Sequence, residues 1–191
     1  MLSWGMVHRS GDAAPPRKGT AMKIYLAGPL GFSEAGRAFH EGTIVREIAR
    51  LGHAPLDPWA MEPTEPALAA EITAAIAMPY GDAKRDTWRK LNMRIGAKNR
   101  ALIDGCDMVF AVLDGVDVDS GTAAEIGYAC AKGKPILGYR GDFRLSADNE
   151  GSIINLQVEY FIRASGGDII TTIAALAPGR SAAILCPREQ R

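Results

Sequence analysis

The stretch that decides the fold is "DMVFAVLDGVDVDSGTAAEIGYACAKGKPILGYR", residues 107–140. It opens with an apolar run typical of a buried strand and continues through an acidic loop into a helix, which Gly133 closes before a second apolar run. A strand, a helix and a strand in this order predict a right-handed crossover within a parallel sheet. Because ligands bind beyond the C-terminal ends of such strands, we expect functional residues in the acidic loop and at the start of the helix.

The chain before this stretch shows the same alternation. Residues 22–28, "MKIYLAG", have the apolar character of a strand, and residues 33–52 carry a helical stripe of apolar side chains. Residues 53–59, "HAPLDPW", predict a second strand that ends in Pro and Trp. We therefore expect Asp57 and Trp59 at the same edge of the sheet as the end of the first strand.

Residues 64–105 predict two helices with a break between them. The break is "MPYGD", residues 78–82, where Pro79 and Gly81 are both unfavourable inside a continuous helix. We interpret this break as a mobile flap.

The C-terminal part has a less regular pattern. Residues 154–162 fit either a strand or a helix, and residues 167–177 predict a last helix. The expected fold is α/β, a single-domain doubly wound (flavodoxin- or Rossmann-like) parallel sheet of about five strands flanked by helices. This domain would span residues 22–178, between a disordered N-terminal extension (1–21) and a C-terminal tail (179–191).

Composition limits the classes of partner. The 191 residues suffice for one domain with a buried core, and 22 basic residues balance 22 acidic ones. No net charge therefore attracts the chain to nucleic acid or to an anionic membrane. The apolar runs are shorter than a membrane span, and the N-terminus has no signal-peptide core. We expect a cytoplasmic protein that binds neither nucleic acid nor membranes.

Nothing in the sequence indicates a metal or an organic cofactor. The three cysteines lack the spacing of a zinc site, and the histidines have no metal-binding partner at a suitable spacing. We expect His40 and His53 at the surface or as helix caps. No glycine-rich dinucleotide or triphosphate motif follows the first strand, so we expect no cofactor.

The ends of the expected strands are acidic and aromatic. They supply residues 27–33 ("AGPLGFS"), 57–59 ("DPW") and 114–121 ("DGVDVDSG"). Two like unit charges about 4 Å apart repel by roughly 1 kcal/mol in water and about 4 kcal/mol at a partly screened surface. A neutral polyhydroxy ligand with an aromatic part therefore suits these strand ends better than a phosphate.

Four segments resemble the nucleoside 2-deoxyribosyltransferase family. They are "KIYLAGPLGFS", "PLDPW", "DVDSGTAAEIGYA" with the following "GKP", and "DNEGSIINLQ", and the third is the most specific. The resemblance covers residues 22–161. It implies a cofactor-free enzyme of nucleoside salvage that moves 2-deoxyribose from a 2'-deoxynucleoside to a free nucleobase. It also implies a homo-oligomer, a dimer or larger, with shared active sites.

The resemblance assigns roles to individual residues. Glu125 matches the nucleophile, and Tyr25 matches a tyrosine that hydrogen-bonds and orients it. Asp119 matches the carboxylate that holds the sugar 5'-hydroxyl, and Asn155 an asparagine that reaches this hydroxyl from a neighbouring subunit. An ionised Glu125 would stabilise the oxocarbenium-like state and then bond to the sugar. We expect the helix start and the tyrosine hydroxyl to favour that ionised form.

Further residues are expected around the substrate. Asp57, Trp59 and Phe32 match the base pocket, where Asp57 is also a candidate catalytic acid. Gly28 and Ser120 lie in matching segments and are expected to contact substrate.

Asn99 departs from the family pattern. Several members carry an aspartate here that assists protonation of the leaving base, whereas an asparagine has no proton to give. Asp57, Asp82, Asp86 or water must then supply it.

The residues also allow simpler interpretations. "TAAE", residues 122–125, is a capping-box pattern in which Glu125 would accept from the Thr122 amide. Asp119 and Ser120 could be helix caps, and Asp57 a turn residue. Core or locally hydrogen-bonded roles are open to the remaining candidates: Tyr25, Phe32, Trp59, Asn99 and Asn155.

Two other functions remain open. A related hydrolase would cleave nucleoside 5'-monophosphates, although Asp119 disfavours a 5'-phosphate. A non-catalytic module would sense nucleotides or nucleosides and use Glu125 only as a cap.

Overall fold

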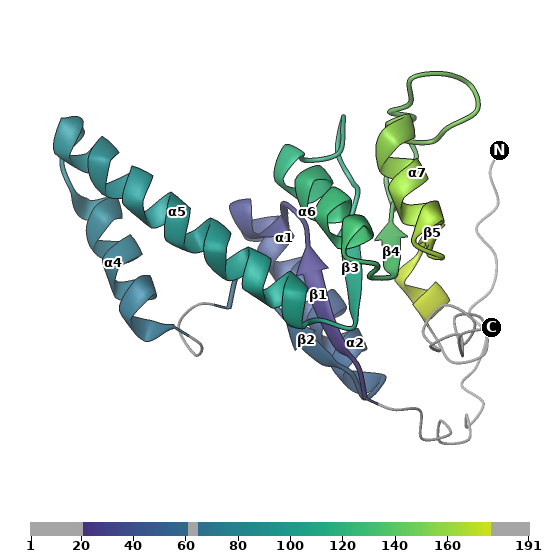
Figure 1. Ribbon diagram of the computed structural model, residues 1–191, viewed down its shortest axis with the longest axis horizontal. Helices are drawn as coiled ribbons and strands as arrows, with labels where there is room; N and C mark the ends of the chain where they lie inside the picture. The colour runs from purple at the N-terminus through teal and green to yellow at the C-terminus, as the bar shows by residue number, and fades with distance from the viewer. Residues whose placement is uncertain (1–20, 61–64, 177–191) are drawn as a thin grey trace, which may run out of the picture.

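The computed structural model describes residues 21–60 and 65–176. They form a five-stranded sheet in the order β2-β1-β3-β4-β5, in which all neighbouring strands are parallel, with helices on both faces (Figure 1). The doubly wound α/β fold expected from the sequence is therefore confirmed. The predicted N-terminal extension, apart from Ala21, and the predicted tail lie outside the described residues.

The structure contains the alternating strands and helices that the sequence predicts for residues 22–140. The strands are β1 (Lys23–Ala27), β2 (Ala54–Leu56), β3 (Met108–Val112), β4 (Ile136–Tyr139) and β5 (Asp168–Ile170). The α-helices are α1 (Glu34–Phe39), α2 (Arg46–Arg50), α4 (Pro66–Ala77), α5 (Asp82–Gly105), α6 (Ser120–Ala131) and α7 (Leu156–Ala164). Short 3-10 helices are η1 (Leu30–Phe32) and η3 (Ile173–Leu176), and η2 (His40–Val45) is a π-helix.

The two faces of the sheet have separate hydrophobic cores. One core joins the sheet to α5, α6 and α7, and the other joins it to η2, α2 and η3. Side chains alternate between the faces along each strand. On β1, Tyr25 belongs to the first core and Ile24 and Leu26 to the second. This alternation directs the Tyr25 ring toward α6.

The helix after β1 contains an irregular middle. It runs from α1 through η2 into α2, and the Ser33 hydroxyl caps its start by accepting from the Gly36 amide at 3.0 Å. The π-helical turn begins at His40 and buries both His40 and Ile44. π-Helical turns are rare and are frequently found at functional sites.

Helices α4 and α5 form a hairpin that projects away from the sheet (Figure 1). Their facing side chains make a small core of their own. Of this hairpin, only the C-terminal end of α5 reaches the core shared by the sheet, α6 and α7, where Ile103 is buried. Across residues 21–60 and 65–176, no helix combines the length and apolar character needed to cross a lipid bilayer.

The predicted flap at residues 78–82 is the tip of this hairpin. Asp82 and Asn99 share α5, so 17 residues at about 1.5 Å each separate them by about 26 Å along the axis. Asp86 is likewise about 20 Å from Asn99 along this axis. Both aspartates pair with arginines one turn on, Arg85 and Arg89. The structure does not bring either aspartate to the site of its own chain.

Two C-terminal expectations are settled by the structure. The ambiguous residues 154–162 belong mainly to helix α7. The last helix predicted over residues 167–177 is wrong at its start, because Asp168–Ile170 form the edge strand β5 beside β4. The β-branched Ile169 and Ile170 fit a strand, and only the short η3 follows.

Candidate active site

Tyr25 and Glu125 form a hydrogen-bonded pair. Tyr25 lies in β1 and is fully buried, and Glu125 lies in the second turn of α6. The Tyr25 hydroxyl donates to Glu125 Oε1 at 2.6 Å, although 100 residues separate the two. The structure therefore brings together the two residues for which the strongest catalytic roles were predicted.

The capping-box alternative for Glu125 is wrong. Helix α6 begins at Ser120, and its N-cap is Asp119. Asp119 Oδ2 accepts from the Thr122 amide at 2.9 Å and from the Thr122 hydroxyl at 3.1 Å. The amide that Glu125 would have capped is therefore already bonded, and Glu125 faces Tyr25 instead.

Burial dominates the electrostatics of this pair. Desolvation raises the pKa of Glu125 above its ordinary 4.5, and the nearby charge of Asp119 raises this pKa further. Hydrogen bonds from Tyr25 and Asn99 lower the pKa of Glu125 but do not offset burial. Our expectation of an environment that favours the anion is therefore wrong in its net direction. Desolvation and then the Glu125 charge raise the pKa of Tyr25, so Tyr25 keeps its proton.

Asn99 approaches the same carboxylate from α5. Its Nδ2 lies 3.4 Å from Glu125 Oε1, a long hydrogen bond. Its Oδ1 is buried and has no hydrogen-bond partner within the described part of the chain. Asn99 therefore serves the carboxylate as a donor, and it cannot release a proton.

Trp59 and Phe32 form an aromatic wall beside the end of β1. The Trp59 indole donates to the Gly28 carbonyl at 3.3 Å, and the two rings meet edge-on with centroids 4.8 Å apart. A Cβ on Gly31 would lie 2.0 Å from the Trp59 ring, and one on Gly28 would lie 2.9 Å from Val112. Both glycines therefore permit close packing, and the role of Gly31 was missed by the sequence analysis. The Phe32 side chain is 75% exposed, so its ring is open to a ligand.

Asp57 and His40 form a buried contact behind this wall. Asp57 Oδ1 accepts from the Trp59 amide at 2.9 Å, and Oδ2 lies 3.0 Å from His40 Nε2. The side chains are only 12% and 5% exposed. The N–O contact has an ion-pair distance but not the angle of a linear hydrogen bond. The expectation that His40 lies at the surface is wrong, because a π-helical turn directs its side chain inward. His40 is the C-cap of α1, but only through its backbone N–H.

Three predicted substrate-binding residues lie at helix starts. Asp119 uses only Oδ2 to cap α6, and Oδ1 accepts no hydrogen bond from the described residues. Ser120 is exposed at the first position of that helix. Asn155 caps α7, where its Oδ1 accepts from the amides of residues 157 and 158 at 3.1 and 3.3 Å. The contact of Asn155 with the sugar 5'-hydroxyl in a neighbouring subunit would involve a second chain, and it stays a prediction.

Comparison with known proteins identifies the family. The model of the family "Nucleoside 2-deoxyribosyltransferase" matches residues 24–157. The chain belongs to this family. The matched segment includes all the site residues described above, and the resemblance noted in the sequence is confirmed.

Three similar proteins share 30% or less of their aligned residues with this chain. A protein of Schizosaccharomyces pombe described as uncharacterized is 30% identical over a match covering 40% of this chain and 54% of that protein, so the chain spans about half of its length. The 2-deoxyribosyltransferase of Bacillus psychrosaccharolyticus is 21% identical over 87% of this chain and 99% of its own, with a TM-score of 0.55. A 2-desoxiribosyltransferase from Leishmania mexicana is 26% identical over 80% and 92%, with a TM-score of 0.52.

A buried arginine holds the acidic loop of this family member. The Arg140 guanidinium is almost fully buried and donates to the carbonyls of Leu113 at 2.5 Å, Gly115 at 3.3 Å and Arg144 at 2.6 Å. It thereby ties the start of the loop that carries Asp119 to the chain after β4. The sequence analysis missed Arg140, because a single cation after a strand has no distinctive pattern.

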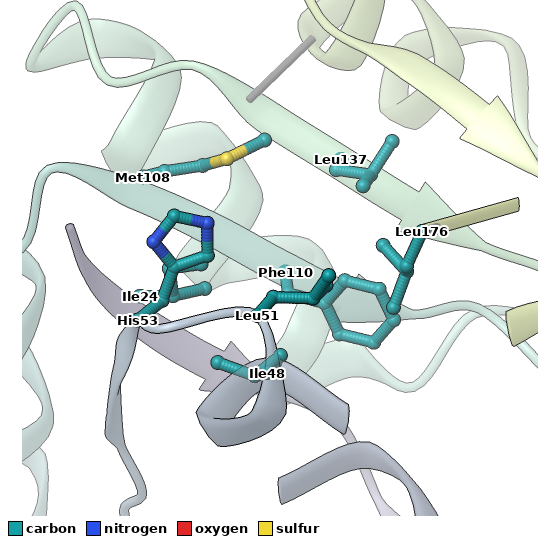
Figure 2. Close-up of a pocket in the computed structure, with 8 residues that line it drawn as sticks. All are labelled: Ile24, Ile48, Leu51, His53, Met108, Phe110, Leu137 and Leu176. Carbon is teal, nitrogen blue, oxygen red and sulfur yellow. The ribbon is translucent and has the colours of Figure 1, made fainter. Parts of the chain in front are cut away.

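The site around Tyr25 and Glu125 is separate from a small apolar cavity among the described residues. Figure 2 shows that cavity, of about 10 Å³, enclosed by seven apolar side chains and His53 on the face of η3 and α2. It has room for about one water molecule and no convergent polar groups. Within residues 21–60 and 65–176, no three His, Cys, Asp or Glu side chains are placed to hold a metal ion.

Proposed function

We propose that this protein transfers 2-deoxyribose between nucleobases through a covalent glycosyl-Glu125 intermediate, as a step of nucleoside salvage. The observation that carries the proposal is the part-buried hydrogen bond between Tyr25, in the middle of β1, and Glu125. A carboxylate held in one orientation, in a chain of the deoxyribosyltransferase family, suits attack on an anomeric carbon.

The hydrogen bonds of Glu125 distinguish its two oxygens. Both Tyr25 and Asn99 donate to Oε1, and Oε2 accepts no hydrogen bond from residues that the structure describes. Oε2 is therefore the atom available to bond C1' of the sugar. As that bond forms, the C1'–N bond breaks and its electron pair passes to the base, which takes up a proton.

Burial of Glu125 favours the covalent intermediate. The same desolvation that raises the pKa of Glu125 disfavours its charge and not the neutral ester. Forming the glycosyl ester removes a partly desolvated charge, so the environment stabilises the intermediate relative to the free carboxylate. The acceptor base then attacks C1' from the face that the first base has left, and the configuration is retained.

The remaining residues supply the binding contacts of the proposal. Asp119 Oδ1 would accept from the 5'-hydroxyl, with Ser120 and Gly28 lining the sugar side. Trp59 and Phe32 would cover the base, and Asp57 would supply its proton. Asn155 would complete the site of a neighbouring subunit in a homo-oligomer.

Base exchange tests the proposal directly. The protein is incubated with a 2'-deoxynucleoside and a different free base, and the products are separated by liquid chromatography. We expect the new deoxynucleoside to accumulate with retained configuration, and intact-mass measurement to show one added deoxyribosyl group. If the protein neither exchanges bases nor releases a base from any 2'-deoxynucleoside, this result would contradict an enzymatic role and favour a sensing module.

Turnover should depend on the 5'-group of the substrate. We expect 5'-monophosphates to react at least about tenfold more slowly than 2'-deoxynucleosides, because a phosphate would meet the Asp119 carboxylate. Replacing Asp119 by asparagine should narrow this ratio while weakening binding of the nucleoside. Equal kcat/KM for the two substrates in the unmodified protein would favour the 5'-monophosphate hydrolase instead.

The acid limb of the pH profile should report Glu125. The nucleophile reacts when ionised, so kcat/KM should fall as pH drops through a pKa above the ordinary 4.5. Asp119→Asn removes a charge that raises this pKa and should move the limb to lower pH. Tyr25→Phe removes a hydrogen bond that lowers it and should move the limb to higher pH. Shifts in the same direction would contradict this assignment of causes.

Activity should also depend on assembly. If Asn155 completes a neighbouring site, dilution to the monomer should abolish exchange, as followed by light scattering alongside the activity assay. Asn155→Ala should reduce activity without preventing assembly. A fully active monomer would contradict the shared site.

A further inference from the structure

We propose that His40 is a positioning residue of this reaction, which shares one proton with Asp57 so that the pair delivers it to the departing base. The inference rests on the proposed transferase function and names the proton source that Asn99 does not provide. It assigns a role to His40, which lies within the matched residues 24–157 but outside the four short segments that carry the resemblance.

The contact between Asp57 and His40 leaves one carboxylate oxygen available for a proton. Asp57 Oδ1 is bonded to the Trp59 amide, so Oδ2 is the oxygen left to exchange a proton, and it lies 3.0 Å from His40 Nε2. Proton transfer across this contact requires the imidazole to turn into a more linear N–H···O geometry than it has here. Both side chains are almost wholly shielded from water. Burying an ionised carboxylate costs free energy unless it gains a proton or a cationic partner. A protonated imidazole can give the carboxylate its proton or remain beside it as the cation.

The backbone around His40 is unusual in the same place. The π-helical turn starts at His40, within a helix that is otherwise regular on both sides. Ile44 is buried in the same turn and holds the turn against the sheet. Such turns are frequently found at functional sites, and here the turn places an imidazole at the end of β2.

The pair lies beside the reacting groups. Asp57 directly follows Leu56, which pairs with Tyr25 across the parallel strands β1 and β2, and Tyr25 in turn donates to Glu125. Trp59, two residues after Asp57, forms the aromatic wall with Phe32. A base held by that wall would therefore be next to Asp57.

Other groups near Glu125 do not supply the proton. Asn99 has only an amide, and Tyr25 retains its proton while it donates to Glu125. Asp119 is the N-cap of α6 and accepts from two groups of Thr122. Asp57 is the carboxyl group that remains within the described site.

The proton balance closes over one exchange. When the C1'–N bond breaks, its electrons pass to the base nitrogen, and the proton moves from Asp57 Oδ2 to the base. The acceptor base loses its own N–H proton as it attacks C1', and Asp57 takes up that proton. Between these two steps the pair is one proton short, and the proton from the acceptor base restores the state in which Asp57 and His40 share one proton.

The test compares two leaving groups in His40→Gln, which keeps a polar side chain but cannot exchange a proton. One substrate is a natural 2'-deoxynucleoside; the other carries an N7-methylated purine, which leaves as a neutral base without protonation. We expect kcat to fall on the order of 10²-fold for the natural substrate. The methylated substrate should lose no more than about threefold, and KM should stay similar for both. His53→Gln, at the apolar cavity, is the matched control and should leave both rates unchanged.

Each outcome decides between roles. Equal losses on the two substrates, or no loss on the natural one, would overturn the proposal and leave His40 as a packing residue, with the transferase function intact. If the unmodified protein releases neither base, the proposed function itself fails. Asp57→Asn provides a second route if His40→Gln does not fold, because it should show the same difference between substrates. Without that difference, the dyad is refuted.

Discussion

Replacing Glu125 by alanine is expected to abolish base exchange, with a loss on the order of 10³-fold or more in kcat, because no other group can form the glycosyl ester. Glu125→Gln should be equally inactive, although its amide oxygen can still accept from Tyr25 and Asn99. Chromatography of the exchange products measures both losses. Near-normal exchange by Glu125→Ala would show that Glu125 is not the nucleophile.

The two Glu125 variants should differ in stability. The pKa of Glu125 is raised in the folded protein, so its stabilising contribution is fully present below its ordinary 4.5 and is lost as pH rises through the folded value. Glu125→Gln avoids this loss and should have a higher Tm than the parent at pH 7, with the difference vanishing at low pH. Glu125→Ala leaves the buried Tyr25 hydroxyl without its acceptor and should be less stable than Glu125→Gln. A parent protein as stable as Glu125→Gln at pH 7 would contradict the raised pKa.

Asp57→Asn is expected to slow release of natural bases by about 10²- to 10⁴-fold, the usual contribution of a general acid. The asparagine oxygen can still accept from the Trp59 amide, so the aromatic wall should remain in place. Substrates whose base leaves without a proton should react at nearly the parental rate. Single-turnover base release with the two kinds of substrate measures this difference.

Asn99→Asp is the complementary change. It places a second titrating group 3.4 Å from the nucleophile and should retain or increase activity while shifting the pH optimum. Equal losses for both kinds of substrate in Asp57→Asn would show that Asp57 only positions the base. The proton would then have to come from solvent, because Asp82 and Asp86 are at the distant tip of the hairpin.

Local patterns sufficed for most of the fold. The buried run of β3, the helix α6 and the run of β4 each follow from the periodicity of consecutive side chains. The failure at β5 has the same origin, because three residues are too few to show a period. Pairing of β5 with β4 decides that structure, and pairing is a contact between separate segments.

Local patterns did not suffice for the site. Taken alone, "TAAE" favoured a capping box, and only the family resemblance indicated a nucleophile. The structure excludes the capping box, because the Thr122 amide donates to Asp119 and the Tyr25 hydroxyl donates to Glu125. These contacts join residues of different elements, which no short stretch of sequence displays.

The sequence by itself determined the alternation of strands and helices, the edge at which the strand ends meet, and the residue types available there. Only the tertiary structure decided which of these residues touch, that His40 is buried against Asp57, and that Asp82 and Asp86 lie far from Glu125. It also reversed the expected direction of the Glu125 pKa. The physical reason is that periodicity is a property of neighbours along the chain, whereas desolvation and hydrogen bonding depend on side chains that distant segments bring together.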